Sequence, residues 1–166
     1  MKKIIFMLIC LVIGIIIYQN NGDIIIPNDA IRIRIIANSN NMVDLYTKQK
    51  LKNEIKGDIY NLVKNSKNSS EASDYIKNNL DIINDIVGKK IDNYKIEYGL
   101  NYFPEKIYKG VVYPSGDYES LVITLGSGLG DNWWCVLYPP LCLIDDNNST
   151  SDVEYQFLVS KVLGLQ

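Results

Sequence analysis

The alternation of apolar and polar positions divides the chain into predicted strands and helices. Residues 31–36 read IRIRII, which places Ile31, Ile33 and Ile35 on one face and the two arginines on the other, as in a half-buried strand. From Val43 to Lys64, apolar residues recur every three or four positions, which predicts an amphipathic helix. A second apolar stripe follows a polar break and ends at Gly88, which predicts another helix.

Four further strands and one helix are predicted in the second half of the chain. They are Tyr94–Leu100, Ile107–Tyr113, Tyr118–Leu125 and Trp133–Tyr138, followed by the helix Val153–Leu163. The last two strands are expected to form a β-hairpin, and short turns between successive strands favour antiparallel pairing. The order β-α-α-β-β-β-β-α therefore predicts an α+β fold, a two-layer sandwich of a mainly antiparallel sheet with helices on one face.

The N-terminus has the pattern of an export signal. Two lysines precede an apolar run at residues 4–18, which fits a secretory signal and is short for a membrane-spanning helix of ~20 residues. No small-residue cleavage site follows, so cleavage and retention as an anchor both stay open. We expect residues 1–22 to be a signal peptide or N-terminal membrane anchor, 23–30 a linker, and 31–166 a single α+β signalling domain.

Composition argues against several classes of function. The net charge of −2 gives no support to nucleic-acid binding, which normally needs a basic patch. The chain has no histidine, which removes Ser-His and Cys-His nucleophile pairs and histidine-bearing zinc sites. The acidic residues of the loops accompany no nucleophile, so a glycosidase is disfavoured. We expect a protein that is not an enzyme and that has no metal site and no cofactor.

The stretch Leu125–Cys142, LGSGLGDNWWCVLYPPLC, is the most unusual in the chain. It contains both tryptophans, two of the three cysteines and a proline pair. Its G-x-G-x-G run does not fit a phosphate loop, because an aromatic strand follows the glycines where such a loop needs a helix. We expect a mobile hairpin loop that brings backbone close to a partner, with a plain glycine turn as the alternative.

The cysteines and tryptophans of this stretch each allow two interpretations. Cys135 and Cys142 flank a forced turn, so they form either a disulfide, worth roughly 2.5 kcal/mol from chain entropy, or two buried free thiols. Trp133 and Trp134 point to opposite faces of a strand, so one can be core while the other is exposed as an interaction hot spot. The alternative is that both tryptophans are packed inside.

The two arginines form a candidate recognition face in a chain that otherwise uses lysine. A planar bidentate donor suits a partner contact, whereas a solvated strand face is the simpler alternative. On either interpretation, replacing both by lysine is expected to change stability by less than about 0.5 kcal/mol. The residues predicted to bind a partner are Arg32, Arg34, Asn38, Gly128, Asn132, Trp133, Trp134, Pro139 and Pro140.

Three stretches together resemble the stage II sporulation protein R family of endospore-forming bacteria. They are DAIRIRIIANSN at residues 29–40, YPSGDYESLVITLG at residues 113–126, and GxGxGxNWWCVLYPPLC at residues 126–142. The chain departs from the family pattern at Asn40 and Asn41, where acidic and serine residues are usual, and at Leu45, where glutamine is usual. These departures weaken any claim that side chains of this turn bind a partner.

The resemblance implies a signalling protein exported from the forespore into the space between two membranes. There it would activate the membrane-embedded aspartic protease of the mother cell that processes a sigma factor precursor, by binding rather than by catalysis. The N-terminal segment offers a possible membrane contact. Two other classes stay open: an envelope protein that binds or hydrolyses peptidoglycan, using its tryptophans as sugar platforms, and a structural envelope protein.

Overall fold

The computed structural model describes residues 3, 5, 7, 9–11, 24–143 and 152–165, and its fold is α+β with the elements in the predicted order. The elements are β1 (Ile24–Ile25), β2 (Ile31–Ile36), α2 (Met42–Val63), α3 (Ser69–Asn78), α4 (Leu80–Gly88), β3 (Tyr94–Phe103), β4 (Lys106–Tyr108), β5 (Val111–Tyr113), β6 (Gly116–Leu125), β7 (Asn132–Tyr138), the 3₁₀ helix η1 (Leu141–Leu143) and α5 (Asp152–Leu163).

The main sheet has the order β3-β6-β2-β7, with β2 at its centre. Strand β2 runs parallel to β6 and antiparallel to β7, and β3 is antiparallel to β6. The predicted hairpin between β6 and β7 is therefore wrong, because β2 lies between these two strands. Both faces of β2 are buried, which suits a central strand rather than the edge. The connection from β6 to β7 must cross the end of β2.

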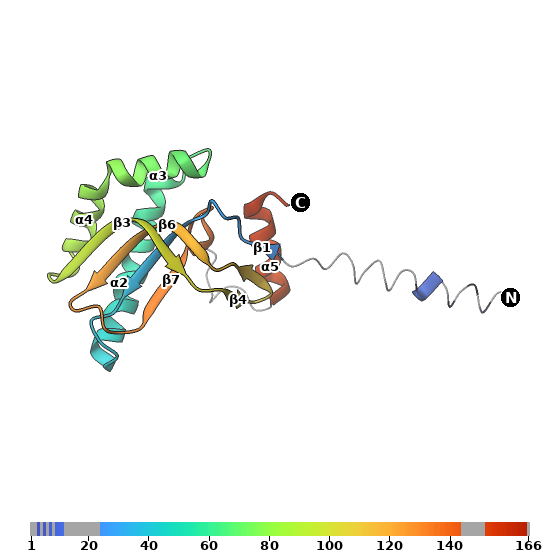
Figure 1. Cartoon of the computed structure of the whole chain (residues 1–166), viewed down its shortest axis with the longest axis horizontal. Helices are drawn as coiled ribbons and strands as arrows, with labels where there is room; N and C mark the ends of the chain where they lie inside the picture. The colour runs from blue at the N-terminus through green and yellow to red at the C-terminus, as the bar shows by residue number, and fades with distance from the viewer. Residues whose placement is uncertain are drawn as a thin grey trace.

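Helices α2, α3 and α4 cover one face of this sheet (Figure 1). The isoleucines of β2 and the apolar stripe of α2 share one core with both shorter helices. The second predicted helix is two helices, since Asn79 leaves helical geometry with φ −123° and ψ 23°. The third predicted strand is likewise the hairpin β4–β5, which turns at Lys109 and Gly110 with φ of 49° and 74°.

The opposite face of the main sheet carries a second layer. Strands β1, β5 and β4 form a small sheet, and α5 lies beside it, away from α3 and α4 (Figure 1). A second apolar core fills this layer, with the Tyr113 and Tyr155 hydroxyls 2.6 Å apart. Residues 24–30, assigned above to a linker, contribute β1 and the buried side chains of Ile26 and Ala30. The part of the main sheet around β2 and β7 is thus covered on both faces, whereas Lys95 and Glu97 of β3 are exposed.

Most of the predicted signal or anchor segment, and residues 144–151, lie outside the described residues. Within the described ranges, no helix combines the length and the hydropathy that crossing a membrane requires.

Candidate partner-binding site

The glycine loop is bound to the turn that follows β2, and we call residues 37–44 together with residues 126–131 the loop junction. The backbone N–H groups of Ser127 and Asp131 donate to the side chains of Asn38 and Asn40, at 2.8 and 2.6 Å. The N–H groups of Leu129 and Gly130 donate to backbone carbonyls of the same turn, at 3.0 and 2.9 Å. The loop, expected to be mobile, is therefore hydrogen-bonded along its length to another part of the chain.

The three glycines allow this close approach. A Cβ at Gly130 would collide with the carbonyl of Ser39, and one at Gly126 would collide with the Asn38 side chain. Gly128 has φ of 66°, and a Cβ there would lie 2.5 Å from the methyl carbon of Thr124. The glycines let the loop approach another part of the same chain, so their presence is explained without a partner. That they also bring backbone close to a partner stays a prediction.

Asp44 is the centre of the polar network in the loop junction. Its Oδ2 accepts hydrogen bonds from Ser39 Oγ at 2.6 Å, Asn38 Nδ2 at 2.8 Å and Asn41 Nδ2 at 2.9 Å. These bonds, that of Ser39 foremost, lower the pKa of the Asp44 carboxyl. Asn41 also caps α2, since its Oδ1 accepts from the Asp44 N–H at 2.8 Å.

Asp44 is absent from the residues predicted from the sequence, although the sequence contains a signal for it. An N-cap residue followed three positions later by an acidic residue is the pattern of a reciprocal helix cap. Asn41 and Asp44 have this spacing at the start of the predicted helix. Asn40, which was set aside as a departure from the family pattern, contributes a second bond by donating from Nδ2 to Asp131 Oδ1 at 3.2 Å.

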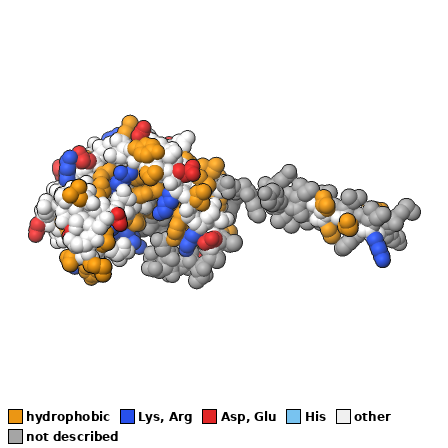
Figure 2. All heavy atoms as spheres, turned by 60° about the horizontal axis from the view of Figure 1, so that its bottom comes forward, with side chains coloured by type: hydrophobic (Ala, Val, Ile, Leu, Met, Phe, Trp, Pro, Cys, Tyr) orange, Lys and Arg blue, Asp and Glu red, His pale blue; other side chains and the backbone are white. Residues whose placement is uncertain are grey.

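Four large apolar side chains surround this network and face solvent, and we call them the apolar tip. Met42, Val43 and Tyr46 in the first turns of α2 are 85%, 73% and 70% exposed, and Leu129 in the glycine loop is 81% exposed. Figure 2 shows hydrophobic side chains gathered at the end of the molecule where α2 begins. Solvent-exposed apolar side chains on a backbone fixed by hydrogen bonds are typical of a protein-binding surface.

Arg32 lies inside the protein, so its expected position on an open face is wrong. It has no exposed surface, and its guanidinium carbon lies 3.5 Å from the ring centroid of Tyr118 and 4.9 Å from that of Trp134. Its Nη2 donates to the carbonyl oxygen of Pro114 at 3.0 Å. Burial lowers the pKa of this guanidinium. The rings that cover it come from other strands of the main sheet, at Phe103, Tyr118 and Trp134, and the alternation of β2 alone does not reveal them.

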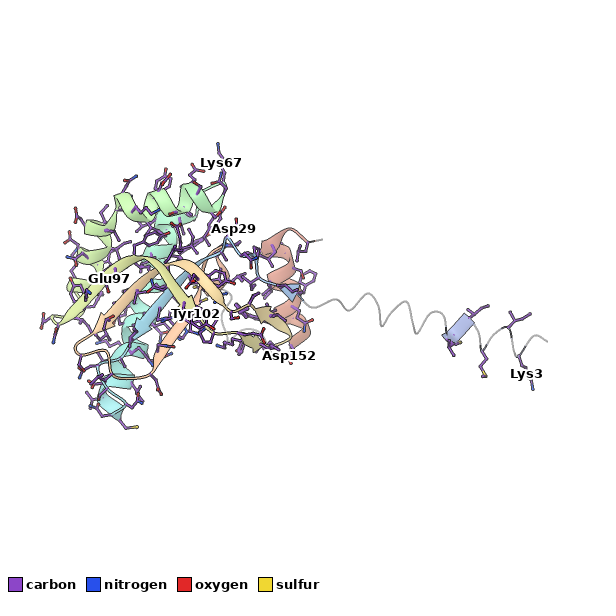
Figure 3. The ribbon with its side chains drawn as sticks, viewed as in Figure 1. Lys3, Asp29, Lys67, Glu97, Tyr102 and Asp152 are labelled. Carbon is purple, nitrogen blue, oxygen red and sulfur yellow. The ribbon has the colours of Figure 1, made fainter. Side chains whose placement is uncertain are left out.

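Arg34 lies one step further along the same face and is only partly buried. Its Nη2 donates to the carbonyl oxygen of Tyr102 at 2.7 Å, and its guanidinium carbon lies 4.0 Å from the ring centroid of Phe103. Tyr102, labelled in Figure 3, lies near the end of β3 where the chain leads into β4. Both arginines therefore join β2 to neighbouring backbone, and a partner contact of Arg34 stays a prediction.

Trp133 and Trp134 point to opposite faces of β7, as predicted, and each is half-buried. Trp133 packs against the core beneath α2. Trp134 packs edge-on against Phe103 and Tyr113, with ring centroids 5.4 and 5.7 Å away. Asn132, at the start of β7, is exposed. The two tryptophans thus form the inner walls of the two layers and keep part of each ring accessible.

The two cysteines of the motif are free thiols in contact with each other, Cys135 before the proline turn and Cys142 after it. Pro139 and Pro140 are partly exposed and return the chain so that Cys142 Sγ donates to the Val136 carbonyl at 2.9 Å. Burial raises the pKa of the Cys142 thiol, and its contact with Cys135 adds to this. A disulfide between them in an oxidising compartment stays a prediction.

Comparison with known proteins identifies the family. The family model described as "Stage II sporulation protein R (spore_II_R)" matches residues 27–148. The chain belongs to this family. It is 36% identical over 144 residues to "Stage II sporulation protein R" of Bacillus subtilis (strain 168). That match covers 83% of this chain and 64% of the relative, so the chain spans less than two thirds of the relative's length. No solved structure matches the chain.

The three stretches that resemble the family are neighbours in the fold of this family member. They form β2 with its turn, β6, and the glycine loop with β7, which are adjacent in the main sheet. Of the predicted binding residues, Asn38 and Gly128 meet in the loop junction, and Asn132 follows it directly. Trp134 meets Arg32 in the second layer, whereas Pro139 and Pro140 lie at the far end of β7.

Proposed function

We propose that this sporulation protein is an exported signal that activates a membrane-embedded aspartic protease by binding to it. The observation that carries the proposal is the apolar tip, whose four exposed side chains are held by the hydrogen bonds of the loop junction. Binding at this surface would favour the active state of the protease, which requires only a difference in affinity between its two states.

The catalytic groups of the proposed pathway belong to the partner. This chain supplies no histidine, and its polar cluster around Asp44 serves to hold two loops together. We place the protein in the space between the forespore and mother-cell membranes, and the support is the pair of N-terminal lysines followed by an apolar run. The protein would thus be made in the forespore and bind a protease in the mother-cell membrane.

Co-purification with the candidate protease tests this proposal. The full chain, tagged, is mixed with the extracytoplasmic part of the protease, and the protease is also expressed with its precursor substrate in cells that make or lack the chain. We expect a retained complex and precursor processing only when the chain is present. Processing without the chain would contradict the proposal. Retention or cleavage of purified peptidoglycan would instead support the cell-wall function.

A further inference from the structure

A cavity of about 150 Å³ lies around the outer edge of β7, on the opposite side of that strand from β2. Its lining includes Lys52 and Lys56 of α2, Lys106 of β4, and both tryptophans. The net charge of the protein is negative, yet no described carboxylate lines this cavity.

The outer edge of β7 offers backbone groups for a further strand. Among the described strands, β7 pairs with β2 alone. Ala37 N–H donates to the Asp131 carbonyl at 3.2 Å, and antiparallel pairs alternate, so the backbone groups of Asn132, Trp134 and Val136 point outward. The carbonyl of Val136 already accepts a hydrogen bond from Cys142 Sγ. Within the described part of the chain, the outward groups of Trp134 have no partner, and that residue lies beside the cavity.

The lysines stand on both sides of this edge. Lys52 Nζ lies 5.4 Å from the ring centroid of Trp133, on the α2 side of the sheet. Lys106 Nζ lies 5.3 Å from the ring centroid of Trp134, on the other side. An anionic group on each side of the edge would be attracted to one of these two ammonium groups.

We propose that the outer edge of β7 binds an extended acidic segment of a partner protein as an added strand. Neighbouring residues of an extended peptide point to opposite faces. Two consecutive acidic residues would therefore place one carboxylate near Lys52 and the other near Lys106. The main-chain bonds to Trp134 supply affinity and the lysine pair supplies selectivity for acid, as in other cases of strand addition. This surface is separate from the apolar tip and does not depend on the proposed protease.

Tryptophan fluorescence of the full chain gives a direct test, because both tryptophans of the protein line the cavity. The probe is the capped peptide acetyl-Thr-Val-Asp-Glu-Val-Thr-amide. A neutral version carries Asn-Gln in place of Asp-Glu, and a third version carries proline in place of both valines, which removes backbone donors. We expect the acidic peptide to bind about tenfold more tightly than either control, with a preference that shrinks as salt is added.

Matched lysine variants show where the peptide binds. K52Q/K106Q is expected to weaken binding of the acidic peptide about five- to tenfold, since it removes both ion pairs. K50Q/K67Q changes the net charge equally but lies away from the cavity, and it is expected to bind like the unchanged chain. Circular dichroism melting confirms that each variant is folded.

Three results would overturn the proposal. One is no fluorescence change with the acidic peptide up to about 1 mM, a very weak complex. Another is equal affinity for the acidic and neutral peptides, or equal loss in the two lysine variants. The third is binding that emerges only when Asp145 and Asp146 are changed to Asn, because the cavity would then serve an acidic segment of this chain rather than a partner.

Discussion

Polar residues at the two ends of β2 differ in burial and in their role in the fold. Near the start of the strand, Arg32 is fully buried among aromatic rings. Beyond the end of the strand, Asn38 and Asn40 lie at the surface and hold the glycine loop. The first group joins two layers of the fold, whereas the second holds exposed apolar side chains in place.

This difference shows that burial, rather than rarity, separates a structural group from a binding group. The arginines are the only two in the chain and so stand out, whereas asparagine is common throughout, and of Asn38 and Asn40 only Asn38 was predicted to bind a partner. Yet the arginine has no exposed surface with which to meet a partner, and the asparagines position a surface that does. Four predictions test this contrast.

The largest effect is expected from Arg32→Lys. Lysine keeps the charge but loses the stacking on Tyr118 and the fork that reaches the Pro114 carbonyl. We expect the free energy of unfolding to fall by about 2–4 kcal/mol, because a desolvated cation–π contact is worth about 2 kcal/mol or more and a buried ammonium would be left poorly paired. Urea denaturation measures this change.

Arg34→Lys is the matched control, since its side chain is only partly buried. We expect a loss of no more than about 1 kcal/mol for this variant. Equal and negligible losses for both variants would show that the arginine face is open to solvent, as the alternation of β2 alone suggested.

Gly130→Ala is expected to disrupt the loop junction. The new Cβ would collide with the Ser39 carbonyl, and a backbone atom cannot move aside as a flexible side chain can. We expect a loss of about 1–3 kcal/mol, the usual cost of overpacking. Gly57→Ala, in the middle of α2 with no atom within 4 Å, is expected to gain about 0.5–1 kcal/mol. Thermal melting of the two variants should therefore move in opposite directions.

The sequence predicted the elements better than their pairing. Hydrophobic periodicity is local, so β2 and α2 were located to within a residue or two. Strand order depends on contacts between distant segments, and nothing local shows that β2 separates β6 from β7. The same limit hid the burial of Arg32, because the aromatic residues that cover it come from three different strands, at Phe103, Tyr118 and Trp134.

The candidate site was predicted in part for the same reason. Rare residues pointed to the stretch with the glycines and tryptophans, and that stretch does form one half of the loop junction. The other half, around Asp44, consists of ordinary polar residues whose role depends on a loop more than eighty positions away. The apolar tip was missed because Met42 and Leu129 become neighbours of one network only after folding.

A smaller effect is expected from the titration of Asp44. Its pKa is lowered in the folded protein, so the carboxylate adds stability above its unfolded pKa of ~3.9, and this contribution is lost as pH falls through the lower folded value. Asp44→Asn should therefore be less stable than the unchanged chain at pH 7 and approach it near pH 2. Denaturation at both values measures this, with Asp58→Asn, on the exposed face of α2, as control. If the free energies of unfolding of Asp44→Asn and the unchanged chain differ by the same amount at pH 7 and near pH 2, the hydrogen bonds to the Asp44 carboxylate do not stabilise the fold.

The most direct test of the central claim is protease activation by a chain with an altered apolar tip. Met42→Ser and Leu129→Ser together remove two of its exposed side chains, and Leu100→Ser with Ile107→Ser removes two that are 73% and 67% exposed elsewhere. The free energy of unfolding of both double variants should lie within about 0.5 kcal/mol of that of the unchanged chain, since all four positions lie at the surface. We expect processing of the sigma factor precursor to fall at least tenfold in the tip variant and to stay unchanged in the control. Normal processing by a folded tip variant would contradict it.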